Sequence, residues 1–156
     1  MAENLISFLT YENIYHIANI GVIPFWLLLI FTPNHFVTSF LVKSIVAPML
    51  LSAAYLFVAY QIYITDNLFE IFNLYFGLEE LYAIFSNEAF LLIFWLHFLS
   101  ISLFVGNWIA SDSRTYSVSR FFVILALIIT YFTGPVGLIF YWIVRIIYSK
   151  KINYYD

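Results

Sequence analysis

Charged residues divide the chain into four long apolar stretches. The windows 13–42, 44–65, 89–111 and 121–144 contain no Asp, Glu, Lys or Arg. A helix of about 20 apolar residues crosses the hydrocarbon core of a bilayer with its backbone groups hydrogen-bonded internally. The pattern therefore predicts an all-α, polytopic membrane protein. We expect a single domain over residues 1–156, with both termini on one side and four transmembrane helices near 14–31, 44–64, 89–110 and 121–147.

The segment 66–85 has a different pattern, in which polar positions recur among Phe, Leu, Ile and Tyr. Glu70, Asn73, Gly77 and Glu80 follow one another at steps of three and four residues. This spacing places one polar stripe along a helix. We therefore expect an amphipathic helix, or two short helices broken at Gly77, that lies in the membrane interface without spanning it.

Composition supports a membrane protein and excludes several other classes. Hydrophobic residues make up 64% of the 156 residues and charged residues only 10%, against about 25% charged in soluble domains. The net charge is −3, and six scattered Lys and Arg residues are too few to neutralise a row of phosphates, so nucleic-acid binding is excluded. The absence of cysteine excludes disulfides and thiolate metal sites.

The basic residues do not decide the orientation of four spanning helices. The loops on one side would carry Lys43, Arg114 and Arg120, and the other side Arg145, Lys150 and Lys151. Three against three is a tie under the positive-inside rule.

Polar side chains near the middle of a span are costly in lipid and are therefore the first functional candidates. His97 lies near the centre of the third span, and Ser100 and Asn107 follow it along one side of an ideal helix. We expect this face to line a polar pocket inside the bundle. The alternative is that His97 only donates a hydrogen bond between helices.

The other side of the same helix carries Ser102, Gly106 and Ala110 at steps of four. Small residues at this spacing allow the backbone of a second helix to approach closely. We therefore expect this face to be a packing surface.

The fourth apolar stretch contains the sequence Thr-Gly-Pro-Val-Gly at residues 133–137. Proline removes a backbone hydrogen bond and glycine loosens the helix, which predicts a break near the middle of the membrane. A break at that depth faces protein or a wet cavity, so Gly134 and Pro135 form a second candidate wall of a binding site, unless the kink serves packing alone. Tyr141 and Arg145 share a face at a step of four, so Tyr141 should point toward the middle of the bundle while Arg145 extends to the membrane interface. In the first helix, His16 and Asn19 form a polar pair, but the two spanning histidines are no metal-ligand set.

Six stretches of the chain form a pattern of defined order and spacing: Ala18-Asn19, Pro24–Leu28, Ala47-Pro48, Trp95–Leu99, Leu103–Ile109 and Gly134–Leu138. In order and spacing they resemble the neoxanthin synthase family of abscisic-acid-deficient-four-like proteins. The similarity covers roughly residues 13–147. It departs from the family pattern at Ser102, where an aspartate is expected.

The resemblance implies a carotenoid epoxide isomerase that forms neoxanthin from violaxanthin in a plastid membrane without a metal or other cofactor. It implies His97 as acid or base, Tyr141 or Asn107 as its hydrogen-bond partner, and Asn19, Trp26, Trp95, Ser100, Gly134 and Pro135 as further substrate-binding residues. The expected partners are membrane lipid, a carotenoid or other apolar polyene, and a larger membrane complex. We expect a multi-pass protein of a bacterial inner or thylakoid-type membrane.

Two other functions remain open from the sequence. Without the aspartate, the protein could bind a pigment as a non-catalytic subunit of a photosynthetic or rhodopsin-type complex. It could also be a small transporter or scaffold unrelated to pigments.

Overall fold

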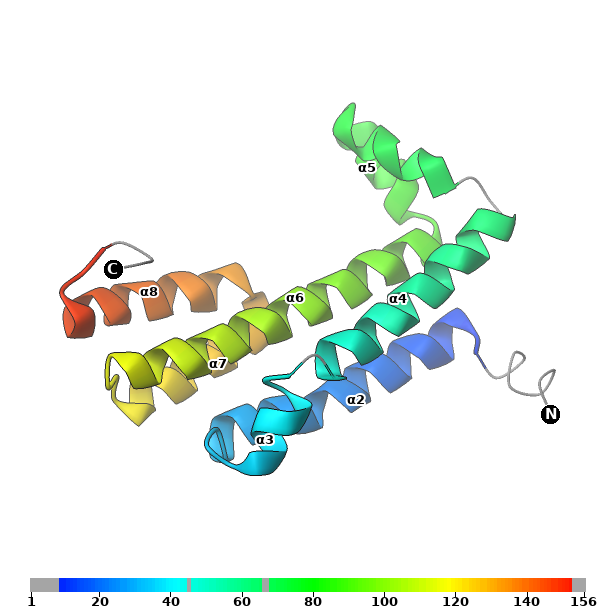
Figure 1. Ribbon diagram of the computed structural model, residues 1–156. Coiled ribbons are helices and arrows are strands. Elements are labelled where there is room, and N and C mark those ends of the chain that lie inside the picture. Colours follow the sequence, from blue (N-terminus) through cyan, green and yellow to red (C-terminus); the bar gives the residue numbers. More distant parts are fainter. Residues whose placement is uncertain (1–8, 45, 66–67, 153–156) are drawn as a thin grey trace. The chain divides into compact units, whose positions relative to one another are not determined.

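The computed structural model describes residues 9–44, 46–65 and 68–152, and the regular elements within these ranges are all helical (Figure 1). They confirm the all-α class. The elements are α2 (Tyr11–Phe31), α3 (Phe36–Leu41), α4 (Val46–Thr65), the 3₁₀ helix η1 (Leu68–Tyr75), α5 (Leu78–Phe85), α6 (Glu88–Thr115), α7 (Arg120–Thr133) and α8 (Pro135–Ser149).

Three predicted spans are present as long apolar helices. By length and composition, α2, α4 and α6 can each cross a membrane. The prediction of a fourth spanning helix over 121–147 is wrong. This stretch forms two helices, α7 of 14 residues and α8 of 15 residues. At 1.5 Å per residue each is about 21–23 Å long, which is shorter than the hydrocarbon core of about 30 Å.

The predicted break lies at Gly134, where the chain reverses. Gly134 has φ 60° and ψ −90°, a backbone conformation that favours glycine. Pro135 takes the first position of α8, where its missing N–H costs no helical hydrogen bond. The rings of Phe122 and Tyr148, at opposite ends of the two helices, lie 6.5 Å apart. α7 and α8 therefore form an antiparallel hairpin (Figure 1).

Gly137 allows the two helices of this hairpin to approach closely. A Cβ atom at this position would meet the backbone nitrogen and Cα of Thr130. Thr130 is fully buried, and its hydroxyl is satisfied by the carbonyl of Ala126 at 2.8 Å. The break at Gly134 is therefore a tight turn between two helices, α7 and α8, that pack against each other.

The segment after α4 takes the two-helix form that the sequence allowed. η1 and α5 are separated by Phe76 and Gly77, and they pack against each other. η1 has no buried residue, while Phe69, Phe72, Phe76, Leu78 and Tyr82 are exposed. Such an exposed apolar surface suits an interfacial position, which stays a prediction.

One short helix was not expected. α3 follows the proline turn after α2, and the Nδ1 atom of His35 accepts a hydrogen bond from the backbone N–H of Val37 at 3.2 Å. His35, to which the sequence gave no role, therefore caps this helix.

Contacts divide the chain into two compact units, which we describe separately. The first comprises residues 1–22 and 49–100, and the second residues 23–48 and 101–156. In the second unit, Trp26 lies against Gly106, and Arg114 donates a hydrogen bond to the carbonyl of Pro33. From the first of these contacts to the second, the residue number rises in both segments. The last turns of α2 and α6 therefore run in the same direction within this unit.

Candidate functional site

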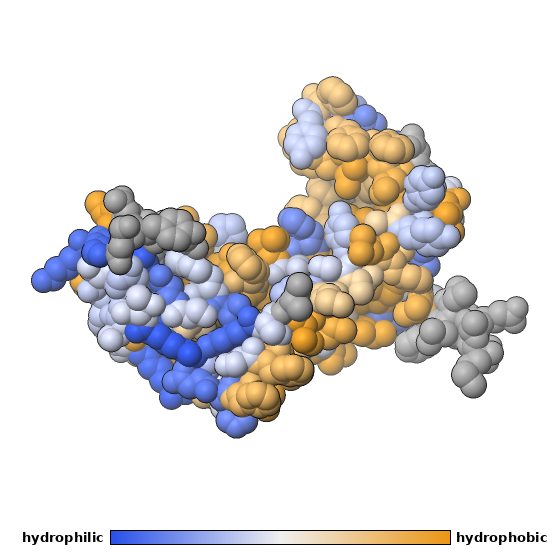
Figure 2. Space-filling view, in the orientation of Figure 1, coloured by the Kyte–Doolittle hydropathy of each residue, from blue (hydrophilic) through white to orange (hydrophobic). Residues whose placement is uncertain are grey.

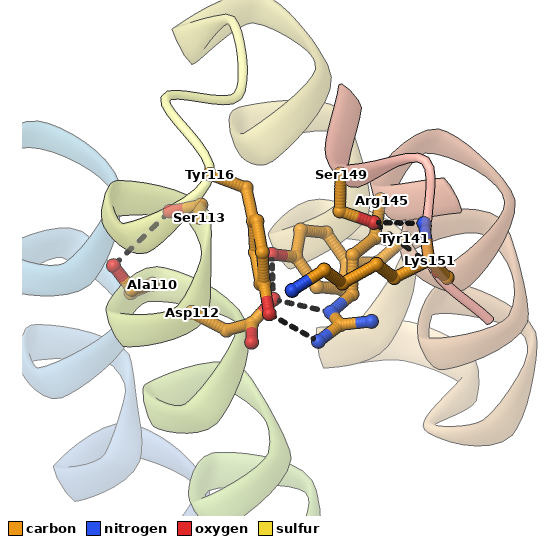
Figure 3. Close-up of polar contacts among 8 residues, drawn as sticks. All are labelled: Ala110, Asp112, Ser113, Tyr116, Tyr141, Arg145, Ser149 and Lys151. Atoms are coloured by element: carbon orange, nitrogen blue, oxygen red, sulfur yellow. Dashed lines mark hydrogen bonds and ion pairs between the residues drawn. The ribbon is translucent and has the colours of Figure 1, made fainter. Parts of the chain in front are cut away.

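The second unit contains a buried charged cluster between α6 and α8 (Figure 3). The carboxylate of Asp112 accepts a hydrogen bond from the hydroxyl of Tyr141 at 2.6 Å and one from Nε of Arg145 at 2.9 Å. Arg145 also donates to the hydroxyl of Tyr116 at 3.0 Å. Tyr141 and Arg145 are both 0% exposed. The cluster therefore holds an ion pair almost entirely away from solvent.

Helical spacing explains how these four side chains meet. Asp112 and Tyr116 are one turn apart on α6, and Tyr141 and Arg145 are one turn apart on α8, so each pair shares a helix face. The guanidinium of Arg145 lies 4.5 Å from the centre of the Tyr116 ring. Such cation–π contact replaces part of the hydration that the buried arginine has lost.

Aromatic side chains enclose the same cluster. The indole rings of Trp108 and Trp142 stack at 5.7 Å, and Trp108 meets the ring of Tyr141 edge-on at 5.4 Å. The guanidinium of Arg145 lies 5.1 Å from the Trp142 ring. This apolar wall strengthens the electrostatic interactions inside it.

Asp112 was not predicted as a site residue, because it follows directly after the third charge-free window. The prediction that Arg145 extends to the membrane interface is wrong, since Arg145 is buried against Asp112. The available signal was the matching four-residue spacing of Asp112 with Tyr116 and of Tyr141 with Arg145. Tyr141 does point inward as predicted, but its catalytic role stays a prediction.

Trp26, a predicted substrate-binding residue, is packed in the second unit. It is 3% exposed, and its ring meets that of Tyr131 edge-on at 5.5 Å. Gly106 makes room for it, since a Cβ atom there would lie 2.7 Å from the indole. The predicted packing face of Ser102, Gly106 and Ala110 is buried. The neighbour at Gly106 is a tryptophan ring and not the expected backbone.

Asn107 carries an unpaired acceptor. Its Oδ1 atom is buried and has no hydrogen-bond partner among residues 9–44, 46–65 and 68–152. An unsatisfied buried acceptor costs about 1–3 kcal/mol.

In the first unit the structure brings together two other predicted residues, from α2 and α6. The indole N–H of Trp95 donates to Oδ1 of Asn19 at 3.1 Å, and Asn19 in turn donates to the carbonyl of Tyr15 at 2.7 Å. Trp95 also lines a hollow of about 490 Å³. The other lining residues are Tyr11, Glu12, Tyr15, Glu88, Leu91 and Leu92.

His97 and Ser100 lie on α6 in the same unit. The imidazole of His97 is exposed, and Ser100 is half-buried. The expected cavity around His97 is therefore not formed by the described residues of its own unit. Phe94, one turn earlier, is also exposed, so His97 lies on an open and largely apolar face of α6. Its role as acid or base stays a prediction, as does that of Gly134 and Pro135 as a wall.

The sequence matches the family described as ABA DEFICIENT 4-like over residues 13–141. The chain belongs to this family. The chloroplastic protein ABA DEFICIENT 4 of Arabidopsis thaliana is 24% identical to it over 144 residues. The match covers 90% of this chain and 64% of the relative, so the chain spans somewhat less than two thirds of that protein. No solved structure matches.

The ABA DEFICIENT 4-like match extends from α2 into α8. It contains Asn19, Trp95, His97, Asn107, Asp112 and Tyr141, and it ends before Arg145. The match thus includes the exposed imidazole of His97, the unpaired amide of Asn107 and the lining of the hollow except Tyr11 and Glu12. It also includes the acidic but not the basic member of the buried ion pair.

Proposed function

We propose that this ABA DEFICIENT 4-like protein isomerises or otherwise modifies a xanthophyll within a membrane. Family membership and three apolar helices long enough to span a bilayer support this proposal. The observation that carries it is the exposed imidazole of His97 on α6. It lies about 14 Å along this helix from Glu88, within the apolar stretch.

An ionisable side chain on a lipid-facing surface is costly unless something covers it. A carotenoid dissolves in the bilayer and reaches such a face laterally, without entering a closed cavity. The exposed Phe94 beside His97 offers apolar contact to a polyene. The face is therefore suited to a substrate that arrives from the lipid phase.

The proposed reaction is an epoxide-to-allene isomerisation. The epoxide C–O bond breaks and its oxygen takes up a proton, while the adjacent polyene carbon loses one. No electron is gained or lost, so the protein has only to move protons. His97 is the proposed acid or base, and an imidazole accepts and donates protons near neutral pH.

The buried amide of Asn107 has a separate proposed role. Xanthophylls carry oxygen on their end rings, and the unpaired Oδ1 atom would accept a hydrogen bond from a ring hydroxyl. Asn107 is therefore proposed as a substrate-binding residue of the second unit, independently of the role proposed for His97.

The test expresses the wild type, His97→Ala and His16→Ala in a host that accumulates violaxanthin and zeaxanthin, followed by separation of the pigments. His16 is the matched control because it is also an exposed histidine, on α2. The wild type and His16→Ala should form a new pigment. His97→Ala should lose about 10²–10⁴-fold in rate while still inserting into the membrane.

Formation of the product without His97 would contradict the catalytic role. The second candidate function is pigment binding without conversion. The hollow beside Trp95 favours it, because three aromatic rings line it and two carboxylates offer acceptors for a hydroxyl. A wild type that changes no pigment but retains a carotenoid through purification would favour this second function.

A further inference from the structure

A second hollow, of about 590 Å³, lies in the second unit where α2 and α6 end and α7 begins. Its lining includes the guanidinium-bearing side chains Arg114 and Arg120, together with His35 and Asn34. None of the described residues that line it is Asp or Glu. The hollow therefore concentrates positive charge without an acidic counterpart in its wall.

The two arginines are held in place by the end of α2. Arg120 donates to the carbonyl of Phe31 at 2.8 Å, and Arg114 donates to the carbonyl of Pro33. A guanidinium has five N–H donors in a planar fork. These bonds to carbonyl groups fix the side chains and leave further donors for an anion.

A third positive charge lies near this hollow. Burial, and secondly the charge of Arg114, lower the pKa of Lys43 to about 8. Lys43 lies in the connection between α3 and α4. Its positive charge and that of Arg114 therefore repel each other, and a bound anion would offset the repulsion.

The position of the hollow indicates where the anion comes from. Phe31 is the last residue of α2, Arg114 is next to the last residue of α6, and Arg120 is the first residue of α7. The ends of apolar helices lie at the headgroup level of a bilayer. Phe31, which lines the hollow, and Phe36 and Phe121 beside it in sequence are more than 60% exposed, as expected of side chains in contact with lipid.

Figure 2 shows hydrophilic side chains gathered at the end of α6 and the start of α7, bordered by hydrophobic ones. We propose that this hollow binds the phosphate group of an anionic lipid headgroup, with Arg114 and Arg120 as its ligands. The guanidinium fork pairs with phosphate oxygens in a bidentate manner. The exposed phenylalanines contact the glycerol and upper acyl region of the same lipid.

The experiment measures lipid retention by the full chain in a non-ionic detergent, using native mass spectrometry. Phosphatidylglycerol is compared with phosphatidylcholine, whose phosphate is neutralised within its own headgroup. The wild type should retain the anionic lipid about tenfold more tightly than the zwitterionic one. One hydrogen bond to a charged group typically lowers a dissociation constant by at least that factor. Arg114→Gln and Arg120→Gln should each reduce this ratio about tenfold.

Lys150→Gln is the matched control, because it removes one positive charge from the same unit but outside the hollow. It should leave the ratio unchanged. Using the ratio of two lipids within one variant separates lost binding from lost stability. Arg120→Lys adds a second check, since it keeps the charge and removes the fork, and it should lie between the wild type and Arg120→Gln.

Equal retention of the two lipids by the wild type would overturn the proposal, as would an unchanged ratio in both glutamine variants. Inorganic phosphate is the third arm of the experiment. If it displaces phosphatidylglycerol at equal concentration, and this depends on Arg114 and Arg120, the hollow is a site for a soluble anion and the lipid assignment is wrong.

Discussion

At the scale of single residues, the most constrained group is the ion pair of Asp112 and Arg145. Arg145 has 1% of its side chain exposed and Asp112 13%. Removing one member of a buried pair leaves the other charge without compensation, whereas removing both is much less costly. The pair therefore connects α6 to α8 in a way that single substitutions should reveal.

We expect Asp112→Asn to lower the free energy of unfolding by about 3–5 kcal/mol, because it leaves the Arg145 charge buried and unpaired. The double variant Asp112→Asn, Arg145→Gln should recover part of this loss. Thermal or denaturant unfolding of the purified protein in detergent measures both. A single variant as stable as the wild type would show that the pair is not formed.

The contact of Gly106 with Trp26 gives a second prediction at this scale. Gly106→Ala places a methyl group against the buried indole and should destabilise the protein by about 1–3 kcal/mol. Gly21→Ala is the control, because a Cβ atom at Gly21 has nothing within 4 Å. It should be neutral or stabilise α2 by up to about 1 kcal/mol. Equal melting temperatures for the two variants would argue against the close contact.

At the scale of elements, the α7–α8 hairpin is the feature that most changes the architecture. Its turn needs the positive φ of Gly134, and its packing needs the missing side chain of Gly137. One side of each helix is packed inside the second unit, as the buried Thr130 of α7 and Tyr141 of α8 show. Other apolar side chains of the pair are exposed, among them Phe132 and Ile139.

Gly137→Ala should separate the two helices, since the added methyl group meets the backbone of Thr130, which cannot move aside without bending α7. We expect a loss of about 1–3 kcal/mol in unfolding free energy. Val136→Ala, at a neighbouring position that is 56% exposed, should change stability by about 0.5 kcal/mol or less. A Gly137→Ala protein that unfolds like Val136→Ala would contradict the hairpin.

At the scale of the whole molecule, connectivity determines the topology. If each of the three candidate spans crosses the membrane, the start of α2 and the end of α6 lie on opposite sides. With the α7–α8 hairpin returning to the side that it leaves, we expect all six Lys and Arg residues on the side where α6 ends. Six basic residues on one side and none on the other predict, by the positive-inside rule, that this side faces the cytoplasm or its equivalent.

We therefore expect the two chain ends to lie on opposite sides, contrary to the expectation from four spans. The sequence has no cysteine, so Glu12→Cys, Ser119→Cys and Ile152→Cys each introduce a unique label site at an exposed position. In sealed vesicles, an impermeant maleimide should label the latter two from the same side and Glu12→Cys from the other. Labelling of positions 119 and 152 from opposite sides would restore the fourth span.

The sequence by itself predicted the features that depend on local pattern. The three long helices and the two short ones on either side of Gly77 follow from charge-free windows and from polar spacing, which are properties of each segment alone. The break at Gly134-Pro135 was also predictable, because proline and glycine weaken a helix wherever they occur. The hydrogen bond between Trp95 and Asn19 was not predicted, although both residues were assigned to substrate binding.

Only the tertiary structure decided what the break does and which polar residues meet. A loosened helix can bend or reverse, and the choice depends on whether Gly137 finds Thr130 to pack against. Asp112 seemed to end a span, yet Tyr141 and Arg145, which lie 29 and 33 residues further along the chain, make it the centre of a buried cluster. The exposed face of His97 was likewise undetermined by its sequence position. Periodicity shows which residues share a face, but only packing determines what each face meets.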